Sequence, residues 1–148
     1  MGKKKSDYTK LLDSLGSYSG IEEVETLEQW LEAREKAIEY IMGIPFEHMT
    51  PEGYSKIDSL LDQWLYEKKE QIKDLFIARL TEFMRFRKRY KPSYIKVLEF
   101  LIDHPEWIDK YHEAKLRTYR EIAEILGYKY STVRDAFSYI RQAGLLEE

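Results

Sequence analysis

The sequence predicts a mainly helical, all-α protein, and three observations support this fold class. Apolar residues recur at spacings of three and four along most of the chain, which is the pattern of a buried helix face. Glycine, proline and capping residues stand where these patterns begin and end. The 148 residues are 43% hydrophobic, enough for the core of one domain or two small ones. We expect a flexible basic N-terminal tail (1–25), a helical region with a long helix (26–91) and a C-terminal helical domain (92–148) with at most a minimal β-sheet.

Residues 1–42 predict the tail and the first helix. Lysines at positions 3–5 and the run G-S-Y-S-G at 16–20 favour a flexible segment. A capping box of Thr26 and Gln29 opens a helix that Gly43 ends. Its outer face repeats four glutamates at helical spacing: Glu28, Glu32, Glu35 and Glu39. Such a face is either a site for a basic partner or, as charge runs more often are, a solvated surface.

Residues 51–91 predict one long helix. Thr50 supplies a cap and Pro51 suits the first turn. Only Gly53 disfavours helix in the ~40 residues that follow, a length of roughly 60 Å. The polar run at 66–71 leaves open a break into a hairpin of two helices. A helix this long carries more apolar surface than one short neighbour covers, so we expect a homodimer that forms through it.

A basic cluster closes the long helix. Residues 85–91, R-F-R-K-R-Y-K, hold five basic side chains with two aromatic ones between them. Phe86 and Tyr90 are four residues apart and are expected to face the core. The cations either complement the helix dipole or contact phosphates, and five exceed what the dipole needs. The expected phosphate ligands are Arg85, Arg87, Lys88 and Arg89.

Residues 92–118 predict two shorter elements. Pro92 opens a helix whose buried side reaches Ile102, and a turn of helix around Trp107 follows. The segment at 116–118 is expected to pair with Leu145 and Leu146 as a minimal sheet.

Residues 118–146 predict two helices joined by a tight turn. The residues that cap or end them are Thr118 with Glu121, then Gly127, then Ser131 or Thr132, and finally Gly144. The inner faces are Ile122, Ala123, Ile125 and Leu126 on the first helix, and Val133, Ala136, Phe137 and Ile140 on the second.

This stretch resembles the helix-turn-helix of DNA-binding proteins, in its winged-helix form. Ala123 lies four residues before Gly127, where the two helices touch, and Val133 lies six residues after it. The ending I-R-Q-A-G-L-L is similar to the exit from a winged-helix recognition helix into the first wing strand. The resemblance implies an archaeal-type transcription regulator whose second helix enters the major groove. The sequence stops at Glu148, so we expect no full two-stranded wing.

The resemblance also implies which residues contact double-stranded DNA. On the second helix, bases or backbone are contacted by Ser131, Thr132, Arg134, Asp135, Ser138 and Arg141. Beside it, phosphates are contacted by Arg120, Lys129 and Tyr130. We therefore expect sequence-specific DNA binding by a homodimer. Two alternatives stay open: a replication or partition protein of a plasmid or virus, and a protein-interaction module that does not bind DNA.

Composition argues against several other classes. The chain has no cysteine, and its three histidines and seven glycines show no metal-site or phosphate-loop spacing. We expect no enzyme, cofactor or metal. No segment approaches the ~20 apolar residues of a membrane span, so we expect a cytoplasmic protein without a membrane partner.

The charges divide the chain into two halves. Residues 11–70 carry a net charge of −9 and residues 71–148 one of +3. Only the second half is therefore expected to approach DNA, and the acidic half is a candidate surface for a protein partner. Asparagine is absent while lysine and glutamate are abundant, a composition typical of thermophilic proteins.

Overall fold

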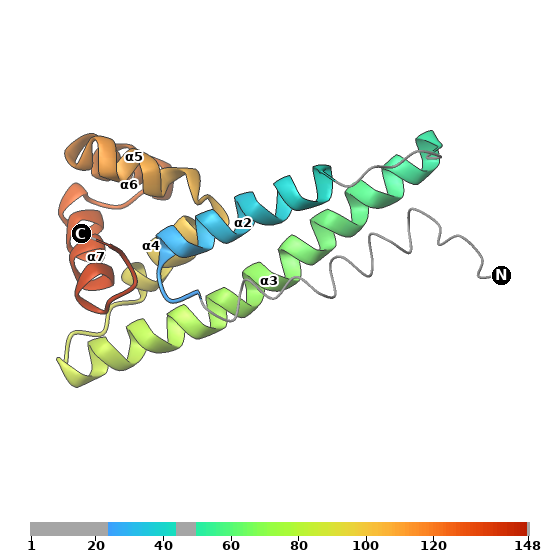
Figure 1. Cartoon of the computed structure of the whole chain (residues 1–148). Helices are drawn as coiled ribbons and strands as arrows, with labels where there is room; N and C mark the ends of the chain where they lie inside the picture. Colours follow the sequence, from blue (N-terminus) through green and yellow to red (C-terminus); the bar gives the residue numbers. More distant parts are fainter. Residues whose placement is uncertain (1–23, 44–49, 148) are drawn as a thin grey trace.

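The computed structural model describes residues 24–43 and 50–147, and this part of the chain is built from helices without strands (Figure 1). Its helices are α2 (Leu27–Met42), α3 (Pro51–Phe86), α4 (Pro92–Asp103), α5 (Glu106–Glu113), α6 (Lys115–Leu126) and α7 (Tyr130–Gln142). The all-α class is therefore confirmed for the described residues. The predicted tail lies outside them, except for Val24 and Glu25.

α2 begins and ends where the sequence predicts. The Thr26 hydroxyl oxygen accepts a hydrogen bond from the Gln29 N–H (3.2 Å), and the Gln29 side chain accepts one from the Glu25 N–H (2.7 Å). Gly43 follows the last turn. The acidic outer face is smaller than predicted, because the Glu28 side chain is only 17% exposed.

α3 is one continuous helix and not a hairpin. Its 36 residues span roughly 54 Å. The polar run at 66–71 does not interrupt it. At the end of this run, α3 is tied to the end of α4. The ammonium groups of Lys69 and Lys73 lie 3.4 and 2.7 Å from the Asp103 carboxylate.

α3 ends earlier than predicted, at Phe86 instead of Lys91. Lys88 takes a left-handed conformation (φ 56°), and the Arg89 N–H donates to the carbonyl of Met84 (2.9 Å). This hydrogen bond satisfies a carbonyl that the helix itself leaves free and turns the chain back toward α4.

One hydrophobic core includes residues of all the described helices. α4 packs against both α3 and α7, and the indole N–H of Trp30 joins α2 to α4 by donating to the Ile102 carbonyl (3.1 Å). The largest buried side chains come from both sides of residue 91 and include Trp30, Phe76, Tyr111 and Phe137. The division at residue 91 stays a prediction, since the core crosses it.

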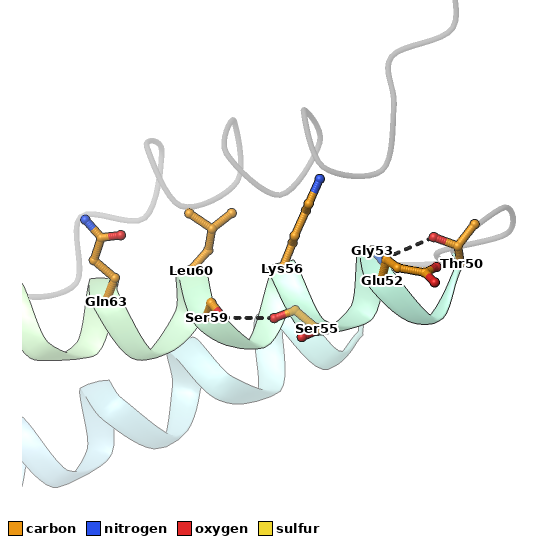
Figure 2. Close-up of a pocket in the computed structure, with 8 residues that line it drawn as sticks. All are labelled: Thr50, Glu52, Gly53, Ser55, Lys56, Ser59, Leu60 and Gln63. Carbon is orange, nitrogen blue, oxygen red and sulfur yellow. Dashed lines mark hydrogen bonds between the residues drawn. The ribbon is translucent and has the colours of Figure 1, made fainter.

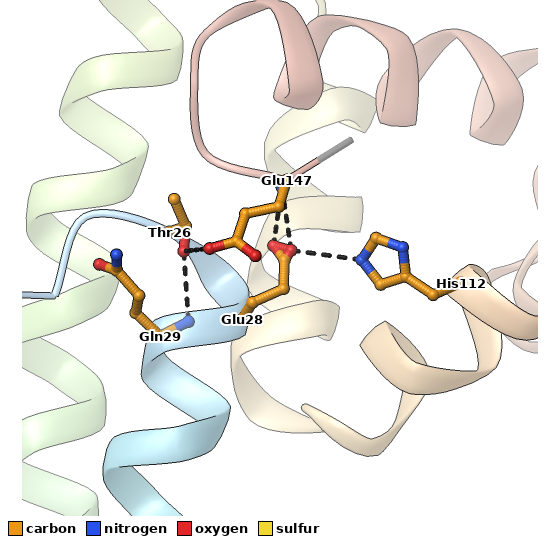
Figure 3. A network of polar contacts seen from close by, with 5 residues as sticks. All are labelled: Thr26, Glu28, Gln29, His112 and Glu147. Carbon is orange, nitrogen blue, oxygen red and sulfur yellow. Dashed lines mark hydrogen bonds and ion pairs between the residues drawn. The ribbon is translucent and has the colours of Figure 1, made fainter.

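Residues 145–147, here called the C-terminal strap, return to the first turn of α2 (Figure 3). The Leu27 N–H donates to the Leu145 carbonyl (2.8 Å). The Glu147 N–H donates to both carboxylate oxygens of Glu28 (2.9 Å each). The same carboxylate lies 3.4 Å from His112 Nε2 on α5, so the strap, α2 and α5 meet at Glu28.

The predicted minimal sheet is therefore wrong. Residues 116–118 lie in the first turn of α6, where their backbone is helical. Leu145 and Leu146 are buried, and the strap bonds to α2 instead. The physical reason is that the first N–H groups of a helix have no partner within the helix and need an outside acceptor.

Candidate nucleic-acid interface

α6 starts three residues before the predicted cap. Ala114 precedes the helix, and the Thr118 N–H already donates to the Ala114 carbonyl (3.0 Å). Thr118 is 2% exposed and sits inside the helix, so it is not the cap. Glu121 accepts from the Arg117 guanidinium (2.9 Å) and closes no capping box. Ile125 is 55% exposed, contrary to prediction, because the buried face of α6 is formed by Thr118, Tyr119, Ile122 and Ala123 instead.

The turn between α6 and α7 is the left-handed one that Gly127 predicts. Its φ is 71°, and the Tyr128 N–H donates to the Ala123 carbonyl (3.0 Å). The cap predicted for α7 is wrong, because the helix begins at Tyr130, before Ser131 and Thr132, and no side chain caps it.

The inner face of α7 is buried as predicted. It consists of Val133, Ala136, Phe137 and Ile140. The Phe137 ring stacks on Tyr111 (4.8 Å between centroids) and packs against Tyr119 (5.1 Å). Burial, followed by the neighbouring Tyr111 hydroxyl, raises the pKa of Tyr119 to about 12, and the charge of Arg141 acts against this rise. Tyr119 is thus a neutral member of the core that fixes α7 on α6.

The outer face of α7 is polar, and its side chains bond to one another. Arg134 is exposed and donates to the adjacent Asp135 carboxylate (3.2 Å). The Ser138 hydroxyl accepts from the Gln142 side chain (2.9 Å). Arg141 is half-buried, so Arg134 is the more exposed of the two arginines of α7. Ser131 is exposed and Thr132 partly so.

The residues predicted to contact phosphates flank this face. Arg120 and Lys129 are exposed. Tyr130 is 37% exposed, and its ring meets Tyr119 edge-on (5.9 Å). Arg120 lies on α6, Lys129 in the turn that follows it, and Tyr130 at the start of α7.

Residues 85–91, here called the basic corner, form the end of α3 and the link to α4. Arg85, Arg87, Lys88 and Arg89 are all exposed. The prediction that the two aromatic residues face the core is wrong, because Phe86 is 87% and Tyr90 49% exposed. The prediction assumed a helix that continues to residue 91, whereas α3 ends at Phe86.

A polar pocket of about 290 Å³ joins the basic corner to α7. Its walls are Arg89, Lys91, Tyr94, Asp135, Ser138, Tyr139 and Gln142. The Tyr94 and Tyr139 rings stack with centroids 5.2 Å apart. The structure therefore brings together two groups that were predicted separately, the cations after α3 and the outer face of α7.

No protein family, curated protein or solved structure matches this chain.

The prediction of the interface omitted Lys91 and Gln142. Gln142 lies four residues after Ser138 and seven after Asp135, so helical spacing alone places it on the same face. Lys91 belongs to the basic cluster in the sequence, but its position beside α7 follows from the reversal at Lys88, which the sequence pattern does not show.

A larger cavity, about 730 Å³, lies at the N-terminal end of α3 (Figure 2). The basic corner lies at the other end of this helix. The hydroxyl groups of the cavity bond to their own helix: the Ser59 hydroxyl donates to the Ser55 carbonyl (3.0 Å), and Thr50 caps the Gly53 N–H. Within residues 24–43 and 50–147, no cluster of three or more metal-binding side chains occurs, and no helix is long and apolar enough to cross a membrane.

Proposed function

We propose that the protein binds double-stranded DNA in a sequence-specific way and acts as a homodimeric transcription regulator. The observation that carries the proposal is the shared pocket in which Arg89 and Lys91 lie beside Asp135, Ser138 and Gln142. A helix with a polar outer face can contact bases in a DNA groove, and a basic cluster beside that face can contact phosphates.

In this proposal α7 enters the major groove as the second helix of a winged-helix-like unit, and Arg134 contacts a guanine edge. A guanidinium matches the two acceptors that guanine presents in that groove. The Asp135 carboxylate accepts a hydrogen bond from the Arg134 guanidinium (3.2 Å) and so orients it before DNA binds. Asp135 and Gln142 are the acceptor and the amide that suit cytosine and adenine edges.

The basic corner takes the place of a wing. The described residues contain no strand to form one, and the strap that follows α7 is bound to α2. Arg85, Arg87, Lys88 and Arg89 supply exposed positive charge next to α7 instead. Such charge contributes affinity that does not depend on sequence and that falls as salt rises.

The proposal is tested by selecting binding sites from a random duplex library with the purified protein at roughly 0.15 M salt. We expect enrichment of a palindromic motif, since a two-fold symmetric dimer presents two copies of α7. If no motif is enriched and binding disappears as salt rises, the proposal of specific recognition is wrong.

A protein-interaction module is the second candidate, because α2 keeps an acidic outer face. Glu35 and Glu39 are exposed, and Glu32 forms an ion pair with Lys36 one helical turn along (2.7 Å). This candidate predicts no DNA affinity at physiological salt.

A further inference from the structure

α3 exposes a stripe of four residues beside its core-facing side. We call Leu75, Arg79, Glu82 and Phe86 the outer stripe; their spacings of four, three and four place them on one helix face. Leu75 is 57% and Phe86 87% exposed. Beside the stripe, an open groove of about 700 Å³ is lined by Ala78, Thr81, Glu82, Arg85 and Phe86.

The two apolar residues of the outer stripe, Leu75 and Phe86, are not part of the core of one chain. The core side of this half of α3 is already filled by Ile72, Phe76, Leu80 and Met84, each at most 1% exposed. Leu75 and Phe86, eleven residues apart, remain outside this core. Exposed apolar groups gathered on one face mark an interaction surface.

The outer stripe is complementary to its own reverse: apolar residues face apolar ones, and each charge faces the opposite charge. An apolar residue stands at each end, and two opposite charges, Arg79 and Glu82, stand between them. In an antiparallel pair of α3 helices whose two-fold axis passes between Leu80 and Thr81, Leu75 faces Phe86 of the second copy. The same register places Arg79 opposite Glu82 of that copy. Self-complementarity of this kind is what a two-fold interface requires.

The charges also decide the direction of the pair. A parallel pair in register places Arg79 against Arg79 and Glu82 against Glu82, which is repulsive. Glu82 forms no ion pair within the described part of the chain. Arg79 is held in place by hydrogen bonds from its guanidinium to the carbonyls of Glu25 (2.7 Å) and Ala143 (3.4 Å), and it keeps its positive charge.

We infer that a second copy of this chain packs antiparallel on the outer stripe. The inference rests on the homodimer of the proposed function and names its surface. The Phe86 side chains of the two copies then lie about 16 Å apart along the helix axis, from eleven residues at 1.5 Å each. The two basic corners are at opposite ends of the contact.

The chain has no cysteine, which permits a direct test by disulfide formation. Leu75→Cys and Phe86→Cys are prepared separately in reduced form. Each variant is then oxidised alone, and a mixture of the two reduced variants is oxidised in parallel. We expect the mixture to form a disulfide-linked dimer at least about tenfold faster than either variant alone, since a disulfide needs α-carbons within about 7 Å. Equal or faster crosslinking of a single variant overturns the antiparallel register.

Sedimentation of the unlabelled protein tests the association itself. We expect a dimer at micromolar concentration and, for Leu75→Glu, a dissociation constant raised at least about tenfold. Because Leu75 is exposed, this variant should keep its helical circular dichroism. The matched control is Leu116→Glu on α6, where the side chain is 65% exposed, and it should leave the association unchanged.

A wild-type protein that remains monomeric at about 100 µM overturns the inference. That result does not decide the proposed DNA binding, which the library selection measures separately. Conversely, a dimer that Leu75→Glu dissociates supports the inference even if no DNA motif is enriched.

Discussion

Arg134 is the side chain that should choose between bases, because it is exposed on the outer face of α7 and held by Asp135. We expect Arg134→Ala to lose about 1–3 kcal/mol of discrimination at one position of the motif. Competition between the selected duplex and single-base variants measures this loss. Unchanged discrimination at every position would show that Arg134 does not contact a base.

The matched control for Arg134 is the double variant Arg87→Ala with Arg89→Ala. Both side chains are exposed in the basic corner, so their loss should weaken all DNA sequences alike. The slope of log K against log salt should become shallower by about 2, close to 0.9 for each phosphate contact. If this double variant keeps its discrimination between bases but has a shallower salt slope, Arg87 and Arg89 contact phosphates and do not read bases.

Asp103 links α4 to α3 and makes the stability of the protein depend on pH. Burial alone raises the pKa of Asp103, but the hydrogen bond and charge of Lys73, together with Lys69, outweigh it and hold that pKa below its usual value. A lowered folded-state pKa means that the stabilisation is complete above about pH 4 and is lost as the pH falls through the folded value. Asp103→Asn should therefore destabilise the fold at pH 7, by about 1–2 kcal/mol.

Denaturant unfolding at pH 7 and pH 3 checks this prediction. The difference between wild type and Asp103→Asn should shrink at pH 3, which is below the ordinary aspartate pKa of about 3.9, because the unfolded chain then takes up a proton at Asp103. The control Asp109→Asn changes an exposed carboxylate on α5 and should lie within about 0.5 kcal/mol of wild type at both pH values. A constant difference across pH would contradict the assigned role of Asp103.

Single residues also show what the sequence predicts well and what it does not. The four inner residues of α7 and the left-handed Gly127 follow from spacing and backbone geometry, which are local. Phe86 was placed wrongly, because its orientation depends on where α3 ends. That end depends on Lys88 adopting a left-handed conformation, which is unusual for a residue with a side chain.

Among the elements, the C-terminal strap is short, but we expect it to contribute strongly to the stability of the fold. Leu145 is completely buried and its carbonyl accepts from Leu27. Leu145→Ala should cost about 2–5 kcal/mol, measured by thermal or denaturant unfolding. Leu116→Ala on exposed α6 surface is the control and should cost less than about 0.5 kcal/mol. A small effect at Leu145 would mean that the strap is not part of the stable fold.

The strap is also the element that the sequence pattern predicted least well. The start and end of α2 and the start of α3 carry capping residues, and both helices begin where these residues predict. Leu145 and Leu146 are too few to show a helical or strand period. Their partner is the start of α2, and nothing in the intervening sequence signals that pairing.

At the scale of the whole molecule, one core passes through α2 to α7. We expect a single cooperative transition in calorimetry, with equal calorimetric and van't Hoff enthalpies. Two separate transitions would support the predicted division at residue 91. The sequence predicted the helices on both sides of that position but not the packing of Trp30 against α4, because such contacts join residues far apart in the chain.

The hydrogen bond from Glu147 to Glu28 spans 119 residues of sequence, and this has a consequence for how the protein folds. Most helical contacts form locally and fast, whereas closing a loop of this length costs about 4 kcal/mol of chain entropy. During synthesis the first turn of α2 leaves the ribosome long before the strap that completes it. The junction of α2 with the strap should therefore be the last part of the core to form and, in native hydrogen exchange, among the first to open.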